Sequence, residues 1–118
     1  EILSSLHRLF LNEPYEVILT DRPDVALRWV RKGGVSLVVA DYRMPDVNGV
    51  EVIRRIRAVS AELPAILLTG HPGETLITQG LRNGEFMIVT KPWDNDKLKR
   101  CVRRLLGLPL QDDPNPPA

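Results

Sequence analysis

The sequence predicts an α/β protein built on a doubly wound parallel sheet with helices on both faces. Short apolar segments alternate along the chain with segments whose apolar residues recur every three or four positions. Strands that alternate with helices in this way usually form a parallel sheet. The apolar segment 36–40 (SLVVA) has no polar alternation, which is typical of a strand covered on both faces. We therefore expect this strand near the centre of the sheet.

The first third of the chain is expected to hold two helices and one strand. Apolar residues at helical spacing predict an amphipathic helix that ends near Asn12, and residues 15–19 (YEVIL) predict a short strand. Asp21 is expected to cap a second helix, with Pro23 in its first turn and Lys32 near its end. The chain therefore begins inside a helix.

The alternation continues beyond the central strand. A helix with apolar positions at regular spacing is expected after Gly49, and AILLT at 65–69 predicts the next strand. A weaker helix is expected over 74–82, interrupted by Gly80, and FMIVT at 86–90 predicts the last strand.

The chain is expected to divide into a domain over 1–106 and a linker or tail over 107–118. The domain closes on a long helix capped by Asp94. The apolar stripe of this helix consists of Leu98, Cys101, Val102, Leu105 and Leu106. The last segment holds four of the ten prolines and has no periodicity, as in a disordered linker.

Composition indicates a soluble, cytoplasmic protein. Sixteen basic and fifteen acidic side chains give a formal charge of +1, which does not suggest direct binding to nucleic acid or to a membrane. Cys101 is the single cysteine, and no apolar run approaches the roughly 18 residues of a membrane span. The basic side chains of the last helix (Lys97, Lys99, Arg100, Arg103 and Arg104) are expected to form a solvated face. Because the first residue is Glu1, we expect the natural start to lie upstream.

Three polar residues fall at the carboxyl ends of three predicted strands: Asp41, Thr69 and Lys91. Ligands bind beyond these ends in open parallel sheets, so the three side chains are expected to converge. A carboxylate can attack phosphorus while a hydroxyl and an ammonium hold the phosphoryl oxygens. Each residue alone indicates little, because an Asp at a strand end more often forms a turn or caps a helix. The combination points to phosphoryl chemistry.

Three segments resemble the receiver domains of two-component response regulators. LVVADYRMPDVNGVEV at 37–52 is similar to their phosphoacceptor strand and loop, AILLTG at 65–70 to their hydroxyl-bearing strand, and TKPW at 90–93 to their lysine–proline turn. The spacings of 28 residues from Asp41 to Thr69 and of 22 from Thr69 to Lys91 also suit this family. The KPW form is similar to receivers found beside cyclic-dinucleotide phosphodiesterase or kinase modules.

The resemblance implies a flavodoxin-like sheet in the order 2-1-3-4-5 and a role in a phosphorelay. Asp41 would accept a phosphoryl group from a histidine kinase or phosphotransfer protein. Thr69 would turn toward the phosphoryl oxygen, Lys91 would pair with it, and the Lys91–Pro92 bond would be cis. Magnesium would bind Asp41 and the backbone carbonyl of Arg43. The surface over 72–106 would then change and control an output domain or partner protein.

Two departures from the family limit how many of these roles can be assigned to this chain. The first strand and the acidic pair that binds magnesium belong upstream of the helix with which the sequence begins, so we expect an N-terminally truncated fragment. Asp41 and one carbonyl are few ligands for octahedral magnesium, and we expect weak or absent binding and little phosphoryl acceptance in this chain. Ile88 also stands where the family often carries an aromatic residue, and Phe86 lies on the same face of the strand about 6.6 Å away.

Two other functions stay open. A degenerate receiver would bind a partner protein without phosphate. A phosphatase or phosphotransferase of the haloacid dehalogenase type would use Asp41 with a second Asp two residues later, where this chain has Arg43. We therefore expect a stoichiometric phosphoacceptor and not a turnover enzyme.

Overall fold

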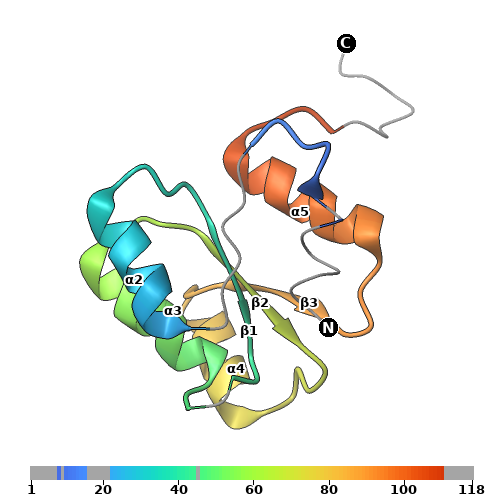
Figure 1. Cartoon of the computed structure of the whole chain (residues 1–118). Coiled ribbons are helices and arrows are strands. Elements are labelled where there is room, and N and C mark those ends of the chain that lie inside the picture. Colours follow the sequence, from blue (N-terminus) through green and yellow to red (C-terminus); the bar gives the residue numbers. More distant parts are fainter. Residues whose placement is uncertain (1–7, 9, 16–21, 45, 111–118) are drawn as a thin grey trace.

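A parallel sheet of three strands lies at the centre of the described part of the computed structural model, which covers residues 8, 10–15, 22–44 and 46–110 (Figure 1). The strands are β1 (Val38–Asp41), β2 (Ala65–Thr69) and β3 (Met87–Thr90), in the order β1-β2-β3. This order matches the last three strands of the predicted 2-1-3-4-5 arrangement. Residues 16–19 of the strand predicted over 15–19 and most of the first helix lie outside the described residues.

Helices cover both faces of the sheet, as predicted (Figure 1). α3 (Gly49–Val59) and α4 (Thr75–Arg82) pack on one face, where Ile53 and Ile77 join a buried cluster with Leu67 of β2. α5 (Asn95–Leu106) packs on the other face through Leu98 and Val102. α2 (Pro23–Lys32) lies against α3.

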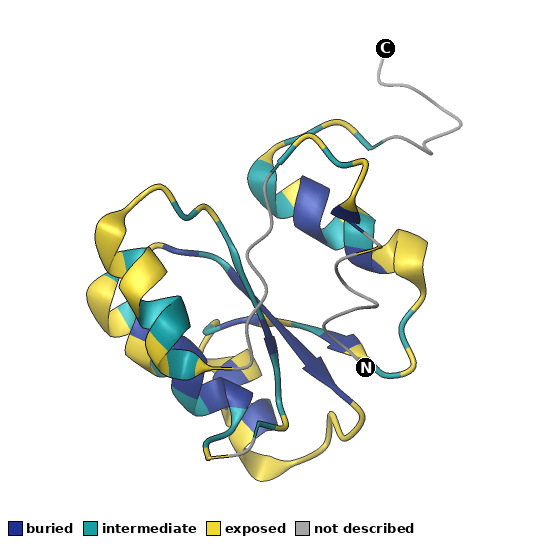
Figure 2. Cartoon of the chain, viewed as in Figure 1, coloured by how far each residue is buried: buried dark blue, intermediate teal, exposed yellow. Residues whose placement is uncertain are grey.

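β2 is buried along its whole length because its side chains alternate between the two helical layers (Figure 2). Ile66 and Leu68 join the cluster on the α5 face, whereas Ala65 and Leu67 join the cluster on the opposite face. Side chains two residues apart lie on the same side of a strand, so Thr69 faces the α3 and α4 layer.

Side chains cap α3 and α5, whereas the N-cap residues of α2 and α4 make no capping hydrogen bond. Asn48 accepts a hydrogen bond from the Glu51 backbone N–H at 2.9 Å, and Asp94 accepts one from the Asp96 N–H at 2.8 Å, as expected of N-cap residues. The N-cap position of α2 is Arg22, whose side chain makes no capping hydrogen bond. The predicted cap, Asp21, lies outside the described residues. None of the helices in the described part has the length and apolar character to cross a bilayer.

The predicted interruption of α4 at Gly80 is wrong, because the helix continues through this residue to Arg82. A Cβ atom at position 80 would lie 2.3 Å from Cε2 of Phe86. The absence of a side chain therefore admits the Phe86 ring, which is buried in the cluster beneath α4. Packing offsets the cost of roughly 1 kcal/mol of a glycine inside a helix.

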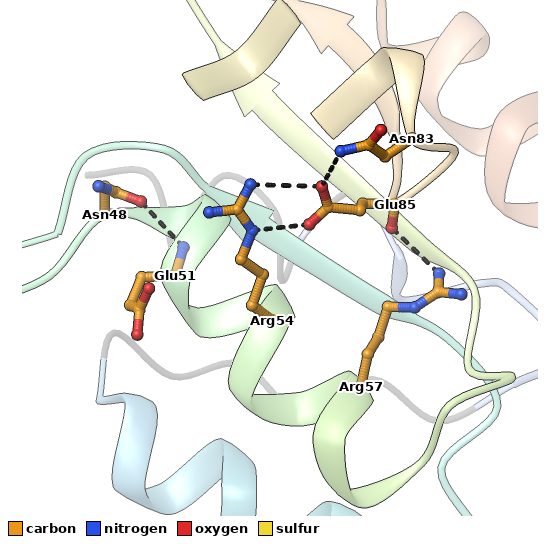
Figure 3. A network of polar contacts seen from close by, with 6 residues as sticks. All are labelled: Asn48, Glu51, Arg54, Arg57, Asn83 and Glu85. Atoms are coloured by element: carbon orange, nitrogen blue, oxygen red, sulfur yellow. Dashed lines mark hydrogen bonds and ion pairs between the residues drawn. The ribbon is translucent and has the colours of Figure 1, made fainter. Parts of the chain in front are cut away.

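A network of polar contacts joins α3 to the connection between α4 and β3 (Figure 3). Arg54 grips the Glu85 carboxylate through Nε at 2.7 Å and Nη2 at 3.3 Å, and Arg57 donates to the Glu85 carbonyl at 3.0 Å. The hydrogen bonds from Arg54 hold the pKa of Glu85 below its ordinary value. Glu85 directly precedes Phe86 and β3, so the network places the start of this strand.

The prediction of a wholly solvated basic face on α5 is wrong for Arg103. Its side chain is buried, and its Nη2 atom lies 2.5 Å from Oε2 of Glu13. The pattern of basic residues did not reveal this because the partner lies ninety positions earlier in the chain.

Candidate functional site

The carboxyl ends of the three strands meet at one edge of the sheet. Asp41 pairs in register with Leu68. Thr69 pairs with Thr90, and its carbonyl accepts a hydrogen bond from the Lys91 backbone N–H at 2.8 Å. The three predicted side chains thus stand at the ends of neighbouring strands. They line a cavity of about 180 Å³ together with Tyr42, Arg43, Gly70 and His71.

Asp41 is held by one of its two carboxylate oxygens. Oδ1 lies 2.7 Å from Nζ of Lys91 and accepts a longer hydrogen bond, 3.3 Å, from the Arg43 backbone N–H. No donor among the described residues contacts Oδ2. The side chains of Asp41 and Lys91 are 20% and 30% exposed, respectively, so the ion pair sits at the mouth of the cavity. One oxygen is therefore oriented by a cation while the other stays open to an incoming electrophile.

Thr69 is buried, and its hydroxyl accepts a hydrogen bond from the His71 backbone N–H at 3.0 Å. The hydroxyl proton is still available to an acceptor in the cavity. Phe86, which directly precedes β3, and Ile88 pack in the same cluster, so the prediction that they face the same side is confirmed. The Lys91–Pro92 bond is cis, also as predicted.

The loop after Asp41 closes tightly on the strand. The Gly49 backbone N–H donates to the Tyr42 carbonyl at 2.8 Å, and Arg43 forms an antiparallel bridge with Asn48. A Cβ atom on Gly49 would lie 2.4 Å from the backbone oxygen of Asp41. Only glycine allows α3 to begin this close to the acidic residue, a role that its place in a loop did not reveal.

Tyr42 and Gly70 line the cavity but were not among the predicted site residues. Each directly follows a predicted one along the chain, which is the signal that could have identified it. The Glu74 carboxylate raises the pKa of Tyr42 above its ordinary value, mainly through a hydrogen bond to the phenol. Glu74 is the N-cap residue of α4, so this contact relates the loop after β1 to the start of α4.

The described residues alone do not fit a magnesium ion. In the part of the chain that the structure covers, no group of three His, Cys, Asp or Glu side chains could hold a metal. Asp41 is the only carboxylate among the residues lining the cavity, and its Oδ1 already faces the Lys91 ammonium. Magnesium requires near-octahedral oxygen coordination, which this set does not supply.

Comparison with known proteins agrees with the geometry of the strand ends. The family model described as "Response regulator receiver domain" matches residues 1–103. The transcriptional regulatory protein DctD of C4-dicarboxylate transport from Pseudomonas aeruginosa is 41% identical over 71 residues. That match covers 60% of this chain and 15% of DctD, so the chain corresponds to a small part of this relative.

Solved receiver domains share the fold. The signal receiver domain of an HD domain-containing protein from Pseudomonas fluorescens superposes with a TM-score of 0.80 at 30% identity, over 90% of this chain and 79% of that chain. The receiver domain of a sensor histidine kinase from Pseudomonas aeruginosa, with a magnesium ion in its active site cleft, gives a TM-score of 0.75 at 24% identity, over 88% and 87% of the two chains. The chain therefore belongs to the family of response regulator receiver domains, the phosphoacceptor signalling modules of two-component systems.

Proposed function

We propose that Asp41 is the phosphoacceptor of this receiver and that Thr69 and Lys91 hold the transferred group. The observation that carries the proposal is the 2.7 Å contact between Lys91 Nζ and Asp41 Oδ1 at the mouth of a cavity that Thr69 also lines. The contact supports the proposal because a carboxylate, a cation and a hydroxyl surround a space suited to a small anion.

The phosphoryl donor would be a histidine kinase or phosphotransfer protein, and magnesium would assist the transfer in the full-length domain. Oδ2 of Asp41 attacks the phosphorus of a phosphohistidine, the new O–P bond forms, and the P–N bond breaks. The imidazole nitrogen of the donor keeps the electron pair of the broken bond. Lys91 then pairs with the phosphoryl oxygens, and the Thr69 hydroxyl can donate its proton to another of them.

Replacing Lys91 by alanine is expected to slow phosphorylation of Asp41 by about 10²-fold, because one preorganised cation no longer meets the charge on the phosphoryl group. Initial rates of labelling with acetyl phosphate measure this effect. Lys97→Ala serves as the control, since Lys97 is an exposed lysine on α5 away from the cavity. Equal labelling rates for the two variants would show that Lys91 takes no part in the phosphorylation of Asp41.

The new charge on Asp41 would shift an existing equilibrium between two conformations. We infer that the surface over 72–106, which includes α4, β3 and α5, presents the change to an output domain or partner protein. The division into a receiver over 1–106 and a linker over 107–118 is part of this proposal. It is supported by the end of α5 at Leu106 and by the left-handed conformation of Gly107.

A receiver that binds partners without phosphate stays the alternative if no acidic pair precedes Glu1, and the described residues themselves hold no metal-binding group. We therefore expect the chain to bind magnesium weakly. In a titration followed by NMR, the amide signals of Asp41 and Arg43 should not saturate at millimolar magnesium. Tight, saturable binding at these two residues would contradict the expectation.

Identification of the modified residue tests the proposed function. The chain is incubated with acetyl phosphate, treated with borohydride and analysed by peptide mass spectrometry, because borohydride reduces a phosphorylated aspartate to homoserine. We expect any homoserine, even at low yield, at position 41. Modification elsewhere, or none with either acetyl phosphate or a phosphorylated histidine kinase, would overturn the proposal. Steady-state hydrolysis of a phosphate monoester would instead indicate an enzyme.

A further inference from the structure

Arg103, in the last turn of α5, contacts two segments that are distant from each other in the sequence. Its Nε and Nη2 atoms lie 3.3 and 2.5 Å from the two carboxylate oxygens of Glu13. Its Nη1 atom donates to the Pro109 carbonyl at 2.7 Å. A single guanidinium therefore joins the segment before α2, the last helix and the residues that follow this helix.

The backbone reinforces this arrangement. Gly107 is left-handed with a φ of 74°, its N–H donates to the Arg104 carbonyl, and the Leu108 N–H donates to the Arg103 carbonyl at 2.8 Å. These two bonds form a Schellman motif, which turns the chain back at the end of α5. The turn brings Pro109 within reach of the Arg103 side chain. Residues 107–110, here called the exit segment, consequently run back past α5 beside residues 11–15 (Figure 1).

The Arg103–Glu13 pair is far more buried than a surface ion pair. Its two side chains are 6% and 2% exposed, respectively. The hydrogen bond from Arg103 holds the pKa of Glu13 below its ordinary value, although burial acts in the opposite direction. A buried ion pair contributes little net stability compared with apolar side chains of the same volume. In some proteins such a pair instead selects one arrangement of the groups that it joins.

We propose that Arg103 is a positioning residue that fixes the direction in which the chain leaves the receiver domain. The planar guanidinium can grip the Glu13 carboxylate with two nitrogens and keep the third for Pro109, which a lysine ammonium cannot reproduce with the same geometry. The exit segment then moves with the body of the domain rather than as a free tether. The relevance to signalling rests on the proposed function, because a module attached beyond this segment would inherit a defined orientation.

If Arg103 only stabilised the core, its replacement would not loosen the exit segment alone. Backbone dynamics therefore distinguish a stabilising role from a positioning role. The reporter is the amide order parameter of Leu110, with Leu105 of α5 as the internal reference. We expect a value near 0.85 at both positions in the unmodified chain, and a fall below about 0.6 at Leu110 alone in Arg103→Met. Glu13→Gln should leave Leu110 ordered, since the contact between Arg103 and Pro109 is kept.

Two further variants keep the test decisive. Arg103→Lys retains the positive charge and is expected to fold, yet to lose order at Leu110. Arg104→Met alters the adjacent, exposed arginine and should change neither position. Unchanged order at Leu110 in both Arg103 variants, or an equal loss in Arg104→Met, would overturn the proposal. The measurements use no phosphoryl donor, so their failure would leave the role of Asp41 untouched.

Discussion

An Asp41→Asn variant is expected to accept no phosphoryl group. The amide keeps the shape of the side chain and an oxygen that can accept the hydrogen bond from the Arg43 N–H, but it lacks the anionic oxygen that attacks phosphorus. The loss should therefore be complete and leave the fold intact. Intact-protein mass spectrometry after incubation with a phosphoryl donor measures acceptance, and circular dichroism verifies folding.

Asp46→Asn is the matched control. Asp46 is an exposed carboxylate in the same loop, five positions further along the chain, and is not among the residues that line the cavity. Its replacement should leave labelling at the level of the unmodified chain. Retained labelling of Asp41→Asn, or an equal loss in Asp46→Asn, would assign the chemistry to another group.

Replacing Glu13 by glutamine is expected to lower the free energy of unfolding by about 3–5 kcal/mol, because it leaves the buried Arg103 charge without its anionic partner. Urea denaturation measures the change. Glu51→Gln removes the partner of Arg55 in an exposed pair on α3 and should cost less than about 1 kcal/mol. Similar costs for the two variants would show that burial of the Glu13 pair has no energetic consequence.

The same pair predicts how stability depends on pH. The folded-state pKa of Glu13 is lowered, so its contribution is fully present above the pKa of the unfolded chain and disappears as the pH falls through the folded-state pKa. Glu85 acts in the same direction through Arg54. The acid-induced loss of stability should therefore be shallower in Glu13→Gln than in the unmodified chain. A parallel decline in both proteins would contradict the lowered pKa.

The sequence predicted the fold and the convergence of three polar side chains at one edge of the sheet because both depend on local patterns. Apolar runs identify strands, and in a parallel sheet the residues that end these strands are carried to one edge, as Asp41, Thr69 and Lys91 are. The wrong expectations concern residues whose environment is set by distant segments. Gly80 predicted a break in α4, but the ring of Phe86 occupies the space where a side chain would lie. Arg103 stands in a basic run, yet it is buried against Glu13.

The alternation of side chains along β2 gives the two sides of the sheet different access to the cavity. The hydroxyl of Thr69 shares its side with Ile77 and Ile88, whereas Val89 and Leu98 lie behind the strand backbone. The hydrogen-bonded strands thus separate two compartments of the core, one on the face of α3 and α4 and one on the face of α5. A displacement that begins at residue 69 reaches the compartment of α3 and α4 first.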